Sequence, residues 1–445
     1  MVKSSTPSQT VASAETQTHA GPGVEAACYY AMAEREAGVI PDVGDDVTAR
    51  PVRRIGVIGA GTMGGGISMN FLNAGIPVAL IDATQAALDR GVSMIRGNYE
   101  RSAAKGKLTP KDVERRMGLL TATTSLEEVA GCDLVIEAVF EDMALKKDLF
   151  ARLDDICKQG AVLATNTSYL DVNEIAKATR RPEDVVGMHF FSPANVMKLL
   201  EVVRGEMSAS EVIVTAMELG RLVGKVPVLV GVCNGFVGNR MLSARRKQAL
   251  ALIQEGAMPW DVDRVLEEFG MPMGPFAMTD LAGLDVGWSS ERSQGDSLLR
   301  DRLCELGRRG QKTHAGYYSY DPKTRQRSAD PMVEALVAEY AMRSGHSQRL
   351  ITDQEILERC LFSSVNEGAK ILEEGIAHRA SDIDVIWVNG YGWPKRRGGP
   401  MYWADDFGLD KVLESVRRYE AMLGNEWHPA ELLCRLAARG GYFTR

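Results

Sequence analysis

Short apolar runs alternate with longer amphipathic segments between Arg54 and about residue 231. The runs read "RIGVIGA", "PVALID", "DLVIEAVF", "AVLATNTS", "DVVGMHFF", "KLLEVV" and "VPVLVG". Apolar runs without polar alternation are typical of strands that are covered on both faces. Because helical segments separate most of them, the pattern predicts a mostly parallel, doubly wound sheet in one α/β domain over residues 51–231.

Helical periodicity dominates beyond Cys233, and this half contains an internal repeat. "GPFAMTDLAGLDV" from Gly274 and "GPMYWADDFGLDKV" from Gly399 share glycine, proline, aspartate and leucine positions at a constant offset of 125 residues. Upstream, "EGAMPWDVD" and "EGIAHRASDID" match with a two-residue insertion. Self-similarity of this kind predicts two related helical domains in tandem, over residues 232–330 and 331–445.

Residues 1–50 have a different character. Residues 1–23 contain almost no large apolar group, so we expect a mobile tail. "VEAACYYAMAEREAG" then has helical spacing and predicts a short linker helix that needs a surface to dock on. The predicted fold is therefore an α/β Rossmann-like doubly wound domain followed by two tandem all-α domains, with residues 1–50 as tail and linker helix.

The totals exclude several classes of protein. A net charge of -7 over 445 residues does not favour nucleic-acid binding. No apolar run reaches the roughly 18 residues of a membrane span, and the N-terminus lacks the order of a signal peptide. The seven cysteines form no C-x-x-C and no framework, as in reduced cytosolic proteins. We therefore expect a cytoplasmic protein without a membrane span or a nucleic-acid partner.

A glycine-rich turn follows the first predicted strand. In "GVIGAGTMGGGI", Gly59, Gly61 and Gly64 have G-x-G-x-x-G spacing at the start of a helix, where backbone amides can hold a pyrophosphate. Asp82 ends the second strand, where its carboxylate would accept ribose hydroxyls and repel a 2′-phosphate, which favours NAD over NADP. The alternative is a structural turn with a capping aspartate. The predicted cofactor-binding residues are Gly59, Gly61, Thr62, Met63, Gly64 and Asp82.

Further polar residues fall where predicted strands end. Glu137 and Glu141 follow "LVIEAVF", and Asn166 and Ser168 follow "AVLAT". Ligands of open α/β sheets bind outside these carboxyl ends. Glu141 and Ser168 are therefore candidate site residues, although either could equally cap the helix that follows it.

A histidine and a glutamate interrupt two of the buried runs, in "MHFFSPANVMKLLEVV". If the two runs pair as an antiparallel hairpin, His189 and Glu201 are equidistant from Asn195 and lie opposite each other. A buried carboxylate would fix the imidazole tautomer and leave the other nitrogen free to accept a proton. Beside a nicotinamide cofactor this predicts alcohol oxidation with His189 as general base. The alternative is a core histidine satisfied by an edge glutamate.

"NGFVGNR" opens the helical half and places Asn239 at the expected cleft, where its amide could bind a substrate oxygen or only cap a helix. The other five histidines stand in tails, turns or exposed helices, and none has metal-ligand spacing. No metal site is predicted.

These motifs together resemble the 3-hydroxyacyl-CoA dehydrogenases of fatty-acid β-oxidation over about residues 52–430. They are "GVIGAGTMGGGI", "EAVFEDMALKKDLF", "NTSYL", "GMHFFSPANVMKLLEVV" and "NGFVGNR", in the family's order. The helical repeat and "YGWPKRRGGPMYWAD" look most like the dehydrogenase part of multifunctional members, as does Ser192, where single-function members usually have asparagine. In those enzymes a hydratase/isomerase region precedes the part seen here, so we expect a naturally short relative or a fragment.

The resemblance implies roles for individual residues. His189 would be the catalytic base and Glu201 its partner, Ser168 and Asn239 would bind substrate oxygens, and Glu141 would lie in the active-site cleft. The implied reaction is NAD-dependent oxidation of (S)-3-hydroxyacyl-CoA to 3-ketoacyl-CoA. The alternatives are a non-catalytic NAD-binding or structural protein on the same fold, and a dehydrogenase of small free hydroxy acids.

The resemblance also bears on assembly. Single-function members dimerise through one helical domain, so the second copy here would occupy the partner's place. We expect a monomer or a homodimer that binds acyl-CoA and associates with other β-oxidation enzymes.

Overall fold

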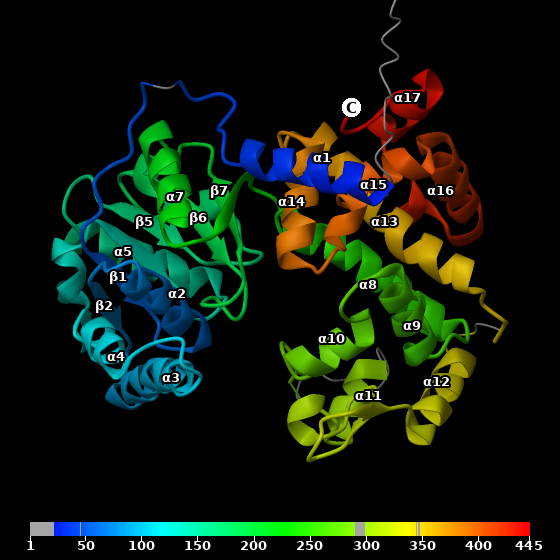
Figure 1. Cartoon of the computed structure of the whole chain (residues 1–445), viewed down its shortest axis with the longest axis horizontal. Helices are drawn as coiled ribbons and strands as arrows, with labels where there is room; N and C mark the ends of the chain where they lie inside the picture. The colour runs from blue at the N-terminus through cyan, green and yellow to red at the C-terminus, as the bar shows by residue number, and fades with distance from the viewer. Residues whose placement is uncertain (1–21, 45, 290–298, 344, 346–347) are drawn as a thin grey trace, which may run out of the picture.

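The computed structural model describes residues 22–44, 46–289, 299–343, 345 and 348–445. The predicted mobile tail lies outside the described residues, apart from its last two positions. Figure 1 shows an α/β half, on the left of the view, and a helical half on the right. The two halves meet where β8 leads into α8.

The α/β half is built on one eight-stranded sheet with the order β3-β2-β1-β4-β5-β6-β7-β8. All neighbouring strands are parallel except β6 and β7, which form an antiparallel hairpin. This confirms the predicted doubly wound α/β fold. The strands are β1 (Ile55–Ile58), β2 (Val78–Ile81), β3 (Leu120–Thr123), β4 (Leu134–Glu137), β5 (Val162–Thr165), β6 (Val185–Phe190), β7 (Leu199–Arg204) and β8 (Val226–Gly231).

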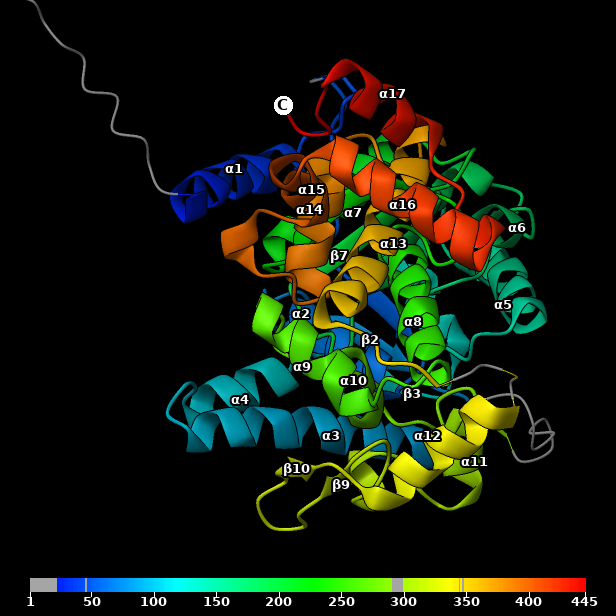
Figure 2. The same ribbon diagram turned by 90° about the vertical axis from the view of Figure 1, so that its right-hand side faces the viewer.

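The central strands are buried on both sides because helices cover both faces of this sheet. Figure 2 shows α3 and α4 lying together at the end of the sheet near β2 and β3. The helices of this half are α2 (Thr62–Asn73), α3 (Gln85–Ala104), α4 (Pro110–Met117), α5 (Met143–Ile156), α6 (Val172–Ala176) and α7 (Ser210–Leu222).

One strand of the eight-stranded sheet was not predicted from the sequence. β3 reads Leu-Thr-Ala-Thr and forms the edge of the sheet, where its residues are half-buried or exposed. An edge strand pairs on one side only and does not need a continuous apolar run. The apolar pattern therefore missed it.

The helical half follows β8. Its first part contains α8 (Gly238–Gln254), α9 (Pro259–Phe269), α10 (Pro275–Ala282), α11 (Leu299–Glu305) and α12 (Pro331–Arg343). Its second part contains α13 (Asp353–Glu373), α14 (Ala380–Gly390), α15 (Pro400–Phe407), α16 (Leu409–Leu423) and α17 (Glu431–Arg439). A hairpin of two-residue strands, β9 (Ser319–Tyr320) and β10 (Arg327–Ser328), interrupts the predicted all-helical pattern. The boundaries 232–330 and 331–445 stay predictions.

The two helical parts repeat one arrangement of buried carboxylates. Asp263 of α9 accepts hydrogen bonds from the first-turn amides of α10, at Phe276 and Ala277 (2.9 and 2.8 Å). Asp384 of α14 accepts the corresponding amides of α15, at Met401 and Tyr402 (2.7 and 3.1 Å). A carboxylate at this position satisfies amides that a helix start leaves unpaired.

This arrangement explains the repeated Gly-Pro pair. A Cβ at Gly274 would lie 2.3 Å from the Asp263 side chain, and one at Gly399 would lie 2.2 Å from Asp384. The following proline stands at the first helical position, where no amide is needed. The glycine thus leaves room for the aspartate side chain at the start of the next helix, and the proline begins that helix without an unpaired amide.

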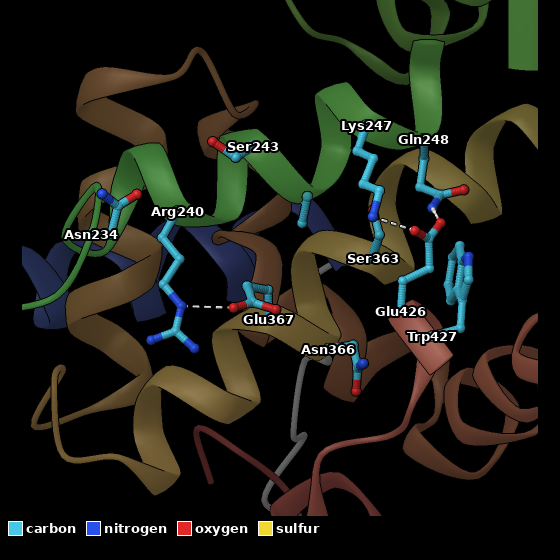
Figure 3. Close-up of a pocket in the computed structure, with 11 residues that line it drawn as sticks. Asn234, Arg240, Ser243, Lys247, Gln248, Ser363, Asn366, Glu367, Glu426 and Trp427 are labelled. Atoms are coloured by element: carbon cyan, nitrogen blue, oxygen red, sulfur yellow. Dashed lines mark hydrogen bonds and ion pairs between the residues drawn. The ribbon is translucent and has the colours of Figure 1, made fainter. Parts of the chain in front are cut away.

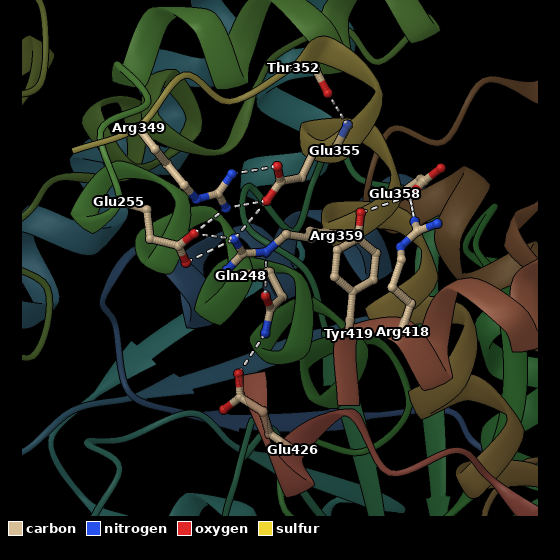
Figure 4. Close-up of polar contacts among 10 residues, drawn as sticks. All are labelled: Gln248, Glu255, Arg349, Thr352, Glu355, Glu358, Arg359, Arg418, Tyr419 and Glu426. Carbon is tan, nitrogen blue, oxygen red and sulfur yellow. Dashed lines mark hydrogen bonds and ion pairs between the residues drawn. The ribbon is translucent and has the colours of Figure 1, made fainter. Parts of the chain in front are cut away.

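The two parts pack against each other through α8 and α13. Buried Arg359 of α13 donates to Gln248 and Glu255 of the first part, and Arg349 also binds Glu255 (Figure 4). Further approaches are reciprocal, because a Cβ at Gly270 would lie 3.0 Å from the Pro394 ring and one at Gly392 would lie 2.8 Å from the Pro272 ring. Reciprocal contacts of this kind are those of a two-fold interface.

The N-terminal helix α1 (Pro22–Glu36) docks on the second part and lies against α14 in Figure 1. Tyr30, Ala33 and Ala37 are buried there. The hydroxyl of Tyr29 donates to Asp384 (2.7 Å). The chain then returns to the sheet, where Arg50 binds Asp184. The predicted linker helix thus has its docking surface on α14.

Candidate active site

The glycine turn between β1 and α2 has the shape that the motif predicted. Gly59 has a φ of 105°, in the region that favours glycine. A Cβ at Gly64 would lie 1.7 Å from the Gly59 carbonyl oxygen, so no side chain fits there. A Cβ at Gly61 would meet nothing within 4 Å, which leaves open space in front of its backbone. These are the features of a turn that admits a pyrophosphate.

The start of α2 is free to bind an anion. Gly61 caps the helix, and within the described residues no side chain caps its first-turn amides. Asp82 at the end of β2 is half-buried and accepts the Ala60 amide (2.8 Å), so its carboxylate stands directly beside the turn. Thr62 is exposed and Met63 is half-buried. The residues present therefore fit NAD.

The β6–β7 hairpin pairs His189 with Glu201 in the predicted register. Imidazole Nδ1 lies 2.8 Å from Glu201 Oε2, and the exposed fractions of the side chains are 5% and 0%. The carboxylate holds Nδ1 and therefore leaves Nε2 as the nitrogen that can exchange a proton. Aromatic rings flank the imidazole, with Phe191 and Phe236 at centroid distances of 4.4 and 5.6 Å.

The second carboxylate oxygen of Glu201 accepts the backbone amide of Gly238 (3.0 Å), at the first turn of α8. Glu201 thus uses both oxygens, one for the imidazole and one for the helical half. An amide at a helix N-terminus favours a negative charge, so this bond stabilises the buried carboxylate.

The turn between the two strands is anchored from two sides. The carbonyl of Ala194 accepts from Asn70 of α2 (3.1 Å) and from Lys225 (2.5 Å), which also donates to the Met197 carbonyl (2.7 Å). Burial lowers the pKa of Lys225 to about 8. The hairpin that carries His189 is therefore tied to the helix of the glycine turn.

Backbone and side-chain contacts connect the carboxyl ends of the parallel strands β1, β4, β5 and β6, each to the next. A Cβ at Gly59 would lie 2.5 Å from the Ala138 carbonyl, which places the glycine turn against the end of β4. The Asn166 amide donates to the Glu137 carbonyl (2.8 Å), and the Asn166 side chain accepts the Phe190 amide (2.8 Å). This chain of contacts connects the glycine turn to the strand that carries His189.

Glu141 organises the loop that contains Ser168. One of its oxygens accepts from the Thr167 hydroxyl (2.6 Å) and from the Ser168 and Tyr169 amides (2.8 and 3.1 Å), while Lys146 lies 3.4 Å from the other. Burial acts to raise the pKa of Glu141, but the Thr167 hydrogen bond and the Lys146 charge lower it overall. The carboxylate is thus held ionised, and the Ser168 side chain is half-buried at the sheet edge.

Asn239 lies in the first turn of α8, next to Gly238, and is half-buried. Its side-chain oxygen accepts from the hydroxyl of Tyr391 (2.9 Å). Asn234, just upstream, donates to the Tyr169 carbonyl (3.4 Å) and joins this segment to the Ser168 loop. Asn239 and Ser168 thus stand on segments that touch each other.

A separate cavity of about 330 Å³ lies between α8 and α13 (Figure 3). Its charged residues are paired, Arg240 with Glu367 and Lys247 with Glu426. None of the predicted site residues lines it. The cavity is lined by Asn234, Arg240, Ser243, Ala244, Lys247, Gln248, Ser363, Asn366, Glu367, Glu426 and Trp427.

Several site residues were not predicted from the sequence. The Gly238 amide and the Phe236 ring belong to "NGFVGNR", in which the sequence indicates only Asn239 as a site residue. Lys146 forms a buried ion pair with Glu137 (2.6 Å) near the candidate site. Tyr391 comes from the second helical part, and nothing in its local sequence indicates that it reaches Asn239.

Comparison with known proteins covers both halves of the chain. The family model described as 3-hydroxyacyl-CoA dehydrogenase, NAD binding domain, matches residues 54–233. The model described as 3-hydroxyacyl-CoA dehydrogenase, C-terminal domain, matches residues 235–320 and 356–443. The second pair of ranges falls on the two parts of the helical repeat.

The chain is 46% identical over 415 residues to the peroxisomal bifunctional enzyme of Pongo abelii, covering 88% of this chain and 57% of that relative. It thus spans less than two thirds of that relative's length. It resembles the crystal structure of the dehydrogenase part of multifunctional enzyme 1 from C. elegans (TM-score 0.67, 33% identity, 93% of this chain and 99% of that one). It also resembles 3-hydroxybutyryl-CoA dehydrogenase from Escherichia coli (TM-score 0.74, 29% identity, 88% and 99%).

The predicted cytoplasmic location is wrong, because the curated relatives are named as peroxisomal or glyoxysomal enzymes. The prediction relied on unpaired cysteines and on the lack of a signal peptide. All seven cysteines are free, but a free thiol does not say which reducing compartment holds the protein. Among the described residues no helix has the length and apolar character of a membrane span.

The glycine turn, the doubly wound sheet and the repeated helical part all lie within the matched ranges, and the NAD-binding description fits the turn's geometry. The chain belongs to the 3-hydroxyacyl-CoA dehydrogenase family.

Proposed function

We propose that this chain is an NAD-dependent (S)-3-hydroxyacyl-CoA dehydrogenase of fatty-acid β-oxidation, which oxidises the 3-hydroxyl group to a 3-keto thioester. One observation carries the proposal. A buried His189–Glu201 pair stands at the carboxyl edge of the sheet, on a hairpin that is tied to the helix of the glycine turn. Family membership supports the acyl-CoA substrate.

In this mechanism His189 Nε2 accepts the proton of the substrate hydroxyl. Glu201 Oε2 accepts from Nδ1–H, which fixes the tautomer and stabilises the imidazolium that forms. NAD, when bound, supplies the acceptor for the hydride that leaves the same carbon, so that the C–OH group becomes C=O. The Phe191 and Phe236 rings limit the access of water to the imidazole.

We further propose that the Ser168 hydroxyl and the Asn239 amide bind the substrate oxygens. Glu141 was predicted as a substrate-binding residue, but three donors occupy one of its oxygens. This favours a role in holding the Ser168 loop in place.

Two alternatives are less well supported. A non-catalytic NAD-binding protein would need the glycine turn but not a buried imidazole with an exchangeable nitrogen, which costs stability unless it is paired. A dehydrogenase of small free acids would not need the family's acyl-CoA motifs.

The assembly follows from the repeat. We propose that the two helical parts form within one chain the pairing that single-function members make between two subunits, which supports a monomer. The reciprocal contacts of Gly270 with Pro394 and of Gly392 with Pro272 support this pairing. The relatives contain further sequence outside the region matched here, which supports association with other β-oxidation activities.

The function is tested with acetoacetyl-CoA and NADH by following NADH absorbance. We expect turnover by the wild-type protein and at least about a hundredfold lower kcat for His189→Ala, because the general acid–base group is lost. His428→Ala is a matched control, since His428 forms a similar contact with Glu420 (2.7 Å) at the exposed surface. We expect it to keep wild-type activity.

Equal rates for wild type and His189→Ala would reject the mechanism. NADH binding without turnover of any acyl-CoA would favour the non-catalytic alternative. Turnover of acetoacetate in preference to acetoacetyl-CoA would favour the free-acid alternative.

A further inference from the structure

Tyr391 brings a buried phenol from the second helical part to the candidate active site. It follows α14, and its hydroxyl donates to the Asn239 side-chain oxygen (2.9 Å). Its ring meets the Phe191 ring edge-on at a centroid distance of 5.6 Å, and Phe191 in turn contacts the His189 imidazole. Tyr391 therefore connects the two groups that the proposed reaction requires.

The backbone is shaped to admit this side chain. A Cβ at Gly238 would lie 2.3 Å from the Tyr391 ring and 2.5 Å from its oxygen, so only glycine leaves room for it. The Trp387 ring stacks on the Tyr391 ring at a centroid distance of 5.1 Å. The same Gly238 gives its amide to Glu201 (3.0 Å). The phenol is thus fixed against the residue that also anchors the catalytic pair.

The hydrogen bond determines what Asn239 can offer to a ligand. Because the amide oxygen accepts the phenol proton, the side-chain nitrogen points the other way with both hydrogens available. Within the residues that the structure describes, that nitrogen has no hydrogen-bond partner. Burial raises the pKa of the Tyr391 phenol well above its usual value, so it remains a donor at all working pH values.

The first helical part provides an internal comparison. "FGMP" from Phe269 corresponds to "YGWP" from Tyr391, and both glycines have positive φ. Phe269 has no hydroxyl and packs against Trp393 at 5.1 Å and Trp403 at 5.5 Å, with the Arg397 guanidinium over its ring at 4.1 Å. The hydroxyl is present only in the copy that faces a candidate site residue.

We propose that Tyr391 is a positioning residue that orients the Asn239 amide to donate to the substrate's 3-oxygen, so that the second helical part contributes to the active site. This rests on the proposed function. In the direction of ketone reduction that oxygen gains negative charge, and a donor held in advance lowers the barrier most at that point.

The test compares Tyr391→Phe with wild type in the acetoacetyl-CoA assay. We expect kcat to fall about tenfold, since one preorganised donor is loosened, with KM changed less than about twofold. NADH affinity, measured by fluorescence, should not change. Tyr419→Phe is the matched control, because Tyr419 lies in the same helical part but donates to Glu358 (2.7 Å), which is not a candidate site residue (Figure 4). It should keep full activity.

A double-mutant cycle separates positioning from general packing. Asn239→Ala should lower kcat by about a hundredfold. Adding Tyr391→Phe to it should change kcat by less than about twofold, because the phenol acts only through Asn239.

A tenfold fall that persists in the Asn239→Ala background, or a matching loss of NADH affinity, would overturn the inference. If the wild-type protein turns over acetoacetyl-CoA and Tyr391→Phe has the same kcat, the inference about Tyr391 is wrong but the proposed function stands. A wild-type protein that never reduces acetoacetyl-CoA would overturn the proposed function with it.

Discussion

The two helical parts contain the same arrangement of buried carboxylates, but one hydrogen bond to the carboxylate comes from a different place in each part. Asp263 receives its third hydrogen bond from Tyr318 (2.8 Å), which belongs to the same part. Asp384 receives the corresponding bond, on the corresponding oxygen, from Tyr29 of α1 (2.7 Å). The three donors to Asp263 all come from its own part, whereas Asp384 takes one donor from a side chain 355 positions away.

A second pair of aspartates shows how far the similarity extends. Asp280 accepts the Tyr317 and Tyr318 amides, and Asp405 accepts the Phe443 and Thr444 amides. Each set joins the end of a helix to a later segment of the same part. Asp280 also accepts the Tyr320 hydroxyl, and Asp405 accepts the Thr444 hydroxyl, so each of these donors belongs to the same part as its acceptor. Tyr29 instead comes from outside the second part, which makes α1 a structural component of that part as well as a linker.

The largest effect is expected from removing either carboxylate. Asp263→Ala and Asp384→Ala should each destabilise the fold by about 3–5 kcal/mol, because two amides and a phenol lose a buried acceptor. Hydrogen exchange should rise at residues 275–282 and 317–320 in the first variant, and at residues 400–407 and 22–36 in the second. Unchanged protection of residues 22–36 in Asp384→Ala would contradict the role given to α1.

A pH titration separates the two carboxylates. Burial raises the pKa of Asp263 from 3.8 to about 6, and burial raises that of Asp384 well above 3.8. A raised carboxyl pKa means that the folded state binds the proton more tightly. The stabilisation is therefore complete below about pH 4 and is lost as pH rises through the folded-state value.

For Asp263 the loss should be about 3 kcal/mol between about pH 4 and pH 6. The free energy of unfolding of Asp263→Asn, measured in urea, should lack this decrease. The Asp384→Asn variant should also lose part of the pH dependence of the wild-type free energy, and the affected range should extend to higher pH. Parallel pH curves for wild type and Asp263→Asn would show that Asp263 does not titrate in this range.

The smallest effect isolates the differing donor itself. Tyr29→Phe and Tyr318→Phe each delete one hydroxyl bonded to a buried carboxylate, which should cost about 2 kcal/mol. Trypsin should cleave after Arg35 of α1 faster in Tyr29→Phe but not in Tyr318→Phe. Equal cleavage of the two variants would mean that α1 is held by its apolar contacts alone.

The sequence predicts most of the fold because the buried strands are continuous apolar runs and the Gly-Pro repeat reflects a local requirement. The half-exposed edge strand β3 and the short β9–β10 hairpin give no such signal. The His189–Glu201 register was predictable because a hairpin pairs positions that are equidistant from its centre. The roles assigned to the site residues stay predictions.

The contributions of Tyr29, Tyr391 and the Gly238 amide could not be predicted. Each acts on a residue far away in the chain, and a tyrosine at helical spacing looks like an ordinary core residue. Only the tertiary packing of α1, of α8 and of the segment after α14 brings these donors to their acceptors.

The bond from Gly238 to Glu201 crosses from the helical half to the sheet. A hinge movement that parted the halves would take one donor away from the carboxylate. The hairpin register would still keep His189 opposite Glu201, so the Gly238 amide couples the charge of the carboxylate, and not the pairing itself, to the position of the helical half.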